Sequence, residues 1–114
     1  YAKELTLLIY KNFEKNKDFG FKDQIQRASV SIMNNIAEGF DRNSDREKIY
    51  FLNVAKGSSS EVKSMLYIAK ELEYIDSERY HQLHCNCVNI SKLLYGLIKS
   101  IEKKQATSDK RQET

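Results

Sequence analysis

Residues 27–39, RASVSIMNNIAEG, decide the fold, because small and apolar side chains recur there at the spacing of an α-helix. We expect this helix to span about residues 21–40. Its apolar side chains form two adjacent stripes that cover about 200° of the circumference, more than one core-facing side requires. The helix is therefore predicted to contact its own bundle and another subunit. The first stripe contains Ile25, Ala28, Ser29, Ile32, Asn35, Ile36, Gly39 and Phe40, and the second contains Val30, Met33 and Ala37.

A narrow polar strip occupies the rest of this helix. Its residues follow one another at spacings of four, three, four and three, so their side chains line up and can hydrogen-bond along the axis. The strip is a candidate site, although it includes no nucleophile and no set of metal ligands. It consists of Arg27, Ser31, Asn34, Glu38 and Asp41.

The composition predicts one small all-α domain. The 114 residues are 40% apolar and include no proline and only four glycines, which favours long helices over strands. No apolar run approaches the roughly 18 to 20 residues of a membrane span, and no secretory signal is recognisable. Cys85 and Cys87 lie two apart on a predicted helix and point to different sides, so we expect no disulfide between them. We expect a soluble protein of the reducing cytoplasm.

Start and stop signals divide residues 1–104 into four helices, at about residues 2–15, 21–40, 44–73 and 76–104. Ser44 with Glu47 makes a capping box for the third helix, and Asp76 is the expected N-cap of the fourth. The short connections predict an antiparallel up-down-up-down four-helix bundle. Residues 105–114 have no hydrophobic period, and we expect them to form a polar, disordered tail.

A basic stripe lies on the predicted third helix, where Lys56, Lys63 and Lys70 recur every seven residues. Arg46 and Tyr67 belong to the adjacent row. A nucleic-acid backbone could lie along the stripe, with lysines neutralising phosphates and the tyrosine offering a stacking surface. A solvated helix face is the alternative, since lysine commonly fills exposed positions. The net charge of +3 permits nucleic-acid binding without requiring it.

Small residues interrupt the same helix at residues 57–61, GSSSE. Glycine and serine lower helix propensity, so we expect them to allow close approach of a neighbouring helix or side-chain bonding to a partner. A tolerated kink is the alternative.

A cluster of histidine and cysteine residues raises the question of a metal site. One helix usually presents two ligands to one metal, so tetrahedral zinc would need ligands from elsewhere. A di-iron site would need a second Glu-x-x-His motif besides Glu78 and His81, and the chain has only two histidines. We predict no metal and no cofactor, although the sequence leaves metal binding by the cluster open. The cluster consists of His81, His84, Cys85 and Cys87.

Glu38 and Glu61 lie among small polar residues and resemble a paired-carboxylate site. No nucleophile, cofactor loop or metal set accompanies them, so we predict a structural polar layer and no enzyme activity.

The motifs RASVSIMNNIAEG and GSSSE, with Arg42, Ser44 and Glu47 between them, resemble the four-helix-bundle family of 23S rRNA intervening-sequence proteins. The resemblance extends from the start at residues 4–10 to LYGLIKSI at residues 94–101. It implies small up-down bundles that assemble as rings, commonly pentamers. Such proteins are similar to the accessory subunits of diversity-generating retroelement reverse transcriptases, which bind nucleic acid and the polymerase.

The resemblance marks a set of signature positions, and we expect them to set helix packing and the subunit interface. These are Arg27, Ser31, Asn34, Asn35, Glu38, Gly39, Gly57, Ser58 and Glu61.

We predict from these features a non-enzymatic homo-oligomeric ring, of five copies by resemblance, that binds RNA, DNA or a ribonucleoprotein. The alternative is a scaffold that docks a partner enzyme such as a reverse transcriptase without touching nucleic acid. The residues expected to contact nucleic acid are Arg42, Arg46, Lys56, Lys63, Lys70 and Tyr67.

Overall fold

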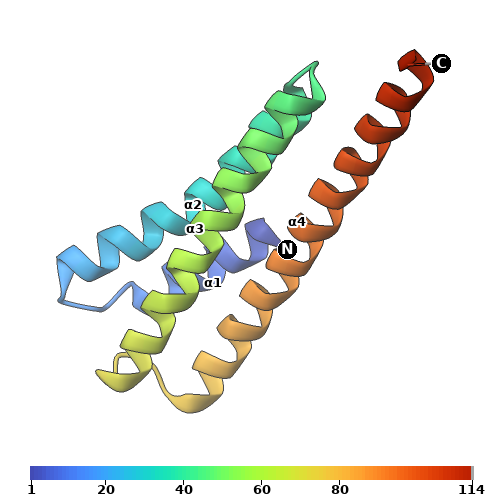
Figure 1. Ribbon diagram of the computed structural model, residues 1–114. Helices are drawn as coiled ribbons and strands as arrows, with labels where there is room; N and C mark the ends of the chain where they lie inside the picture. The colour runs from blue at the N-terminus through green and yellow to red at the C-terminus, as the bar shows by residue number, and fades with distance from the viewer. Residues whose placement is uncertain (114) are drawn as a thin grey trace.

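The computed structural model describes residues 1–113, with side chains described as far as Thr107, and it contains four α-helices in that range. Each helix packs against its neighbours in the chain, and α1 also packs against α4, so the four close into an antiparallel bundle (Figure 1). This confirms the predicted all-α, up-down-up-down architecture. The helices are α1 (Ala2–Phe13), α2 (Phe19–Asp41), α3 (Asp45–Glu71) and α4 (Ser77–Glu113).

Three helices begin at an oxygen-bearing side chain that accepts a backbone N–H. Ser44 Oγ accepts from the N–H of Glu47 at 3.1 Å at the start of α3, and Asp76 Oδ1 accepts from that of Arg79 at 2.8 Å at the start of α4. Both caps were expected from the sequence. Asp18 caps α2 in the same way, so this helix begins at Phe19, earlier than its apolar period indicates.

The C-terminal end of α3 differs from the sequence prediction, because the helix stops at Glu71 and not near Glu73. Glu73 adopts a left-handed conformation with φ of 61°. The N–H of Tyr74 then donates to the carbonyl of Ala69 at 2.8 Å, which satisfies one of the last helix acceptors. Glycine usually occupies such a position, so the sequence carried no stop signal there.

The core consists of one buried stripe from each helix. Three aromatic rings close the end of the bundle where α1 meets α2, with ring centroids 5.8 Å apart for Phe13 and Phe21 and 5.4 Å apart for Phe21 and Tyr74. Two buried serines interrupt the apolar packing. The hydroxyl oxygen of one of them, Ser59, lies 3.2 Å from the hydroxyl oxygen of Ser91. The largest fully buried side chains are those of Leu5, Ile9, Phe13, Ile25, Ile32, Leu52, Val62, Leu66, Leu83, Cys87, Ile90 and Leu94.

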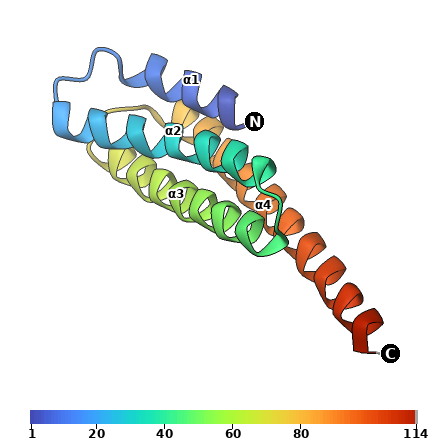
Figure 2. The same ribbon diagram turned by 90° about the horizontal axis from the view of Figure 1, so that it is seen from above.

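The four helices differ in length. All four pack together at one end of the bundle, whereas only α2, α3 and α4 are present at the other. At about 1.5 Å per residue, the 12 residues of α1 span about 18 Å and the 23 of α2 about 35 Å. Figure 2 shows α1 ending partway along α2. Beyond its N-terminus an apolar groove of about 310 Å³ opens, lined among others by Tyr1, Ile36, Leu93 and Leu97.

The end of α4 differs from the disordered tail expected for residues 105–114. In the structure the helix continues to Glu113 and extends past the other three helices (Figure 2). Residues 102–113 contain neither glycine nor proline and are rich in lysine, glutamine and other helix formers, which explains why the helix does not stop at residue 104. Thr114 lies outside the described residues. Across the described helices, none has the length and apolar composition needed to cross a membrane.

Candidate functional site

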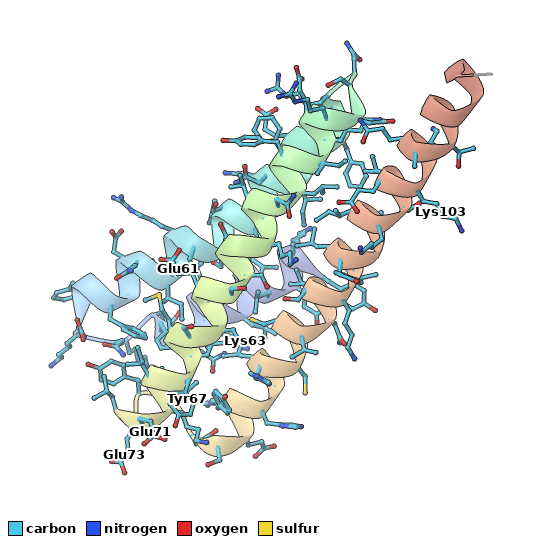
Figure 3. All side chains as sticks on the ribbon, viewed as in Figure 1. Glu61, Lys63, Tyr67, Glu71, Glu73 and Lys103 are labelled. Carbon is cyan, nitrogen blue, oxygen red and sulfur yellow. The ribbon has the colours of Figure 1, made fainter. Side chains whose placement is uncertain are left out.

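The predicted basic stripe lies on the flank of α3 that faces α4. Lys56 and Lys63 line a groove of about 530 Å³ between the two helices. Figure 3 shows Lys63 on this flank. The opposite wall comes from α4, which contributes Lys92 and Tyr95 together with Val88 and Ser91. This α4 contribution has no signal in the sequence, because it depends on how α3 and α4 pack together.

Tyr95 lies where lysines from both helices meet. The Nζ atoms of Lys56 on α3 and Lys99 on α4 lie 5.7 Å and 5.5 Å from the centroid of its ring. The tyrosine itself is 54% exposed. Lys99 also lies 4.0 Å from the carboxylate of Glu102, measured from Nζ to Oε2, at a highly exposed position where such a pair adds little. The ammonium groups and the aromatic ring therefore remain accessible from solvent.

A second group of aromatic and basic side chains lies farther along the same flank. Lys70 Nζ is 4.7 Å from the ring centroid of Tyr80 and 5.9 Å from that of Tyr67. Tyr80 also stacks on His84 with centroids 5.5 Å apart. The structure thus brings the predicted residues Lys70 and Tyr67 together and adds Tyr80 from α4.

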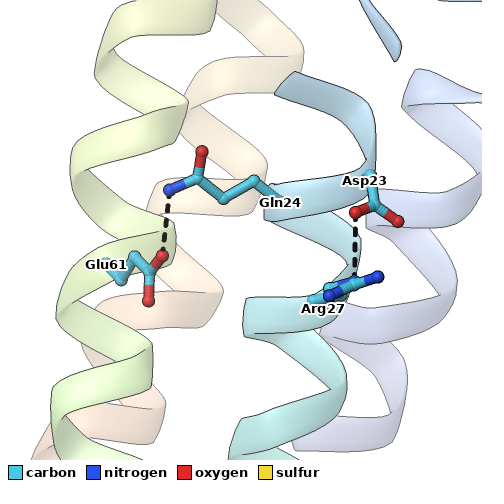
Figure 4. A network of polar contacts seen from close by, with 4 residues as sticks. All are labelled: Asp23, Gln24, Arg27 and Glu61. Atoms are coloured by element: carbon cyan, nitrogen blue, oxygen red, sulfur yellow. Dashed lines mark hydrogen bonds and ion pairs between the residues drawn. The ribbon is translucent and has the colours of Figure 1, made fainter. Parts of the chain in front are cut away.

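Basic residues are concentrated in the two helical segments that border the groove. Residues 48–70 and 79–101 together contain seven lysines and arginines and one acidic residue, a net charge of +6 against +3 for the whole chain. The acidic residue is Glu61, which points to the α2 flank of α3 and accepts a hydrogen bond from Gln24 Nε2 at 3.3 Å (Figures 3 and 4). The groove itself is lined by three lysines and by no acidic residue, whereas Glu47, Glu71, Glu78 and Glu102 lie directly beyond the ends of the two segments.

The predicted phosphate contacts Arg42 and Arg46 lie at the α2–α3 turn and do not line this groove. Arg42 donates to Glu38 at 2.9 Å, and its guanidinium carbon lies 4.8 Å from the ring centroid of Phe51. Within the described residues its buried Nε has no hydrogen-bond partner. Arg42 is thus engaged in joining α2 to α3, whereas Arg46 is exposed in the first turn of α3.

The signature residues on α2 and α3 meet across the contact between these helices. Ser31 Oγ lies 2.8 Å from Ser58 Oγ. The Nδ2 of Asn35 donates to the carbonyl of Ser31 at 2.8 Å and to its hydroxyl at 3.1 Å. These contacts place the three side chains in one small polar layer between α2 and α3.

The polar strip of α2 does not form the continuous axial chain that its spacing suggested. Arg27 Nε pairs with Asp23 at 3.0 Å, on its own helix, while the neighbouring Gln24 reaches across to Glu61 (Figure 4). Asn34 is exposed. The strip therefore consists of separate short contacts, because the side chains on a helix find nearer partners one turn away or across the interface.

Two signature glycines occupy different environments. A Cβ placed on Gly39 would lie 3.5 Å from Leu52 Cγ and from the carbonyl of Lys48, which marks a close approach of α2 to α3. In the described part of the chain, no atom lies within 4 Å of a Cβ placed on Gly57. The expected close approach of a helix therefore involves Ser58 and Ser59 within the chain, and Gly57 faces outward. The helix α3 is continuous through this position.

The histidine and cysteine residues of α4 do not converge on one point. Cys85 Sγ lies 3.6 Å from His81 Nε2, whereas His84 stacks on Tyr80 and Cys87 is buried in the core. Burial raises the pKa of the Cys87 thiol to about 12. Among the described residues, no three or more histidine, cysteine, aspartate or glutamate side chains are grouped to hold a metal ion.

Both a protein-family model and solved structures match this chain. The model of the 23S rRNA-intervening sequence protein family matches residues 1–96. A crystal structure from Bacteroides thetaiotaomicron VPI-5482, described as a protein with unknown function from the S23 ribosomal protein family, is 30% identical with a TM-score of 0.78. It aligns over 87% of this chain and 92% of that one. None of the curated proteins matches. The family match confirms the resemblance found in the motifs.

Proposed function

This chain belongs to the 23S rRNA-intervening sequence protein family, and we propose that it is a non-enzymatic protein that binds RNA or DNA through the groove between α3 and α4. The lining of the groove carries the proposal, because Lys56, Lys63 and Lys92 are among the six residues that line it and none of the six is acidic. Lysines that only solvated the surface would be expected beside acidic residues that balance their charge locally.

The mechanism is electrostatic. Phosphates of the nucleic-acid backbone bind the ammonium groups along the groove and release condensed counterions, with little reading of base edges. Each phosphate neutralised on a single strand contributes about −0.7 to the slope of log affinity against log salt concentration. The lysines that line or flank the groove are Lys56, Lys63, Lys92 and Lys99.

We propose further that the chain assembles as a homo-oligomeric ring, of five copies as the resemblance implies. The apolar circumference of α2 and α3 supports this, because Phe40 is 60% exposed, Ile68 48% and Leu72 53% in the single chain. A ring would repeat the groove around an axis and so multiply its local field. The proposal includes a cytoplasmic location, which suits two free thiols and access to nucleic acid.

Charge reversal tests this function. Fluorescence anisotropy with labelled RNA and DNA at low salt should show binding by the wild-type protein that weakens steeply as salt rises. The double variant Lys56→Glu/Lys63→Glu should lose binding. A matched control, Lys11→Glu/Lys15→Glu, makes the same change in net charge at exposed positions on and just after α1 and should retain it.

No binding by the wild-type protein at low salt, or binding indifferent to salt, would exclude the mechanism. Equal losses in both double variants would show that net charge matters and the groove does not. Circular dichroism should show unchanged helix content in both variants before their affinities are compared.

A protein-interaction scaffold is the second candidate, and one observation favours it. The apolar groove beyond the N-terminus of α1, lined by Ile36, Leu93 and Leu97, has the character of a surface that accepts a partner helix. Reversal of Lys56 and Lys63 should leave such a contact intact, because that groove lies between α2 and α4. Retention of a partner enzyme by the charge-reversed variant would support this candidate.

A further inference from the structure

We infer that Tyr95 is a stacking platform for an unpaired base, so that the α3–α4 groove selects single-stranded RNA or DNA over duplex. The inference rests on the proposed nucleic-acid function and adds the kind of ligand that the groove prefers. It comes from the geometry around Tyr95, where side chains of α3 and α4 meet.

The surroundings of Tyr95 match the two parts of a nucleotide. Tyr95 is 54% exposed and lines the groove, and Lys56 and Lys99 approach its ring from different helices. Lys92 lies one turn earlier on α4 and lines the same groove. A base on the ring would therefore have cationic groups on both sides of it, where the flanking phosphates of a strand lie.

The contacts of Lys56 and Lys99 with the ring are long and should be given up when a base binds. Both Nζ atoms are near the limit of about 6 Å at which a cation is attracted by an aromatic face. Lys56 and Lys99 are exposed and flexible, so either ammonium group can move from the ring to a phosphate at little cost. A stacked base, which contributes on the order of tenfold in affinity, outweighs such a contact.

Duplexes cannot use this platform. Their bases are stacked on one another and present only edges in the grooves, so a duplex can meet the lysines but cannot reach the face of Tyr95. Single strands expose the faces of their bases, and stacking accepts any base because each has a π-face. The groove should therefore bind single strands more tightly than duplexes, whatever their base sequence.

A second aromatic position lies on the same flank of α3, beyond the residues that line the groove. Tyr67 and Tyr80 flank Lys70, which lies fourteen residues, or about 21 Å along the axis of α3, from Lys56. Lys63 lies halfway between them. A strand that continues from the groove along this flank would thus pass from one aromatic and basic position to another, with the cationic side chain of Lys63 in between.

Paired affinity measurements test the inference. A labelled oligonucleotide of mixed sequence without self-complementarity and its duplex of equal length are titrated with wild-type protein, Tyr95→Ala, Tyr95→Phe and Tyr10→Ala. We expect wild-type protein to prefer the single strand, and Tyr95→Ala to lose about tenfold for it while duplex affinity changes less than twofold. Tyr95→Phe should recover most of that loss, since the ring is retained. Tyr10→Ala removes an exposed tyrosine from α1, which does not pack on α3, and should match wild type.

The outcomes separate this inference from the proposed function. If binding depended on salt but had equal affinity for the single strand and the duplex, and were unchanged in Tyr95→Ala, the stacking role would be overturned. The electrostatic function would then still stand. No binding of either ligand by wild-type protein would overturn both.

Photochemical crosslinking gives an independent readout. An oligonucleotide carrying 5-iodouracil should crosslink to the peptide that contains Tyr95 when the complex is irradiated, because the reaction requires a base in contact with the ring. Crosslinks confined to tyrosines outside the groove would overturn the assignment.

Discussion

The hydroxyl oxygens of Ser31 on α2 and Ser58 on α3 lie 2.8 Å apart, although 27 residues separate them in the chain. This contact joins the two motifs that distinguish the sequence, RASVSIMNNIAEG and GSSSE. Small side chains at both positions let α2 and α3 approach closely while each hydroxyl has a partner. The motifs thus form one polar layer between two helices.

The losses in free energy of unfolding caused by removing the two hydroxyls should not be additive. We expect Ser31→Ala and Ser58→Ala each to lower the free energy of unfolding by about 1 kcal/mol, because each leaves a half-buried hydroxyl or amide with fewer partners. The double variant should cost little more than either single variant, since both hydroxyls are then gone. Urea denaturation at one protein concentration measures this. Strictly additive losses would show that the two hydroxyls do not interact.

Two exposed glycines provide a matched test of the subunit interface. Gly57→Ala and Gly96→Ala should each stabilise the protein by up to about 1 kcal/mol, because alanine favours helix and a Cβ meets no described atom within 4 Å at either site. Gly57→Gln should reduce the mass measured by light scattering if Gly57 lies in the proposed interface, whereas Gly96→Gln should not. An unchanged mass for Gly57→Gln would remove Gly57 from the interface.

The left-handed residue after α3 is a site for stabilisation. Glu73 has φ of 61°, where a Cβ costs about 1 kcal/mol relative to glycine. We expect Glu73→Gly to raise the midpoint of thermal unfolding, and Glu73→Ala to leave it near wild type. A lower midpoint for the glycine variant would mean that the Glu73 side chain makes a stabilising contact that offsets the backbone strain.

A hydrogen bond between distant loops makes stability depend on pH. Tyr74 Oη donates to Asp18 Oδ2 at 2.7 Å, which lowers the pKa of Asp18 below 3.8 and raises that of Tyr74 above 10.0. The contribution of Asp18 is therefore present above pH 3.8 and lost as pH falls through its folded pKa, and that of Tyr74 is present below pH 10.0 and lost as pH rises through its folded pKa.

Tyr74→Phe should make the free energy of unfolding less dependent on pH at both the acidic and the basic extreme. We expect the difference in free energy of unfolding between wild type and variant to be constant at intermediate pH and to shrink toward both extremes. Tyr50→Phe, at an exposed tyrosine on α3, is the control and should follow wild type throughout. A wild-type advantage that does not change with pH would mean that the hydrogen bond is not the cause.

The two thiols should differ in reactivity. Cys87 is buried and its pKa is raised to about 12, so almost none of it is thiolate at pH 8, whereas Cys85 is exposed. A colorimetric thiol reagent should therefore label one cysteine per native chain and two after denaturation. Rapid labelling of both in the native protein would show that α4 opens locally.

The sequence by itself determined the four helices and the starts of α3 and α4. The apolar period, the lack of proline and the caps Ser44 and Asp76 are local properties, which act within one turn or one helix regardless of the rest of the chain. The end of α3 was predicted at the wrong residue because it does not depend on such a local signal. A left-handed Glu73 is imposed by the following loop and has no signature of its own in the sequence.

The tertiary structure alone decided which side chains meet across helices. The lysine stripe of α3 was visible as a seven-residue repeat, but its partners Tyr95 and Lys99 depend on the rotation and axial register of α4. Core contacts set that register, including the one between Ser59 and Ser91. A helical period specifies the face that a helix buries, whereas the packing of all four helices specifies what each exposed face lies beside.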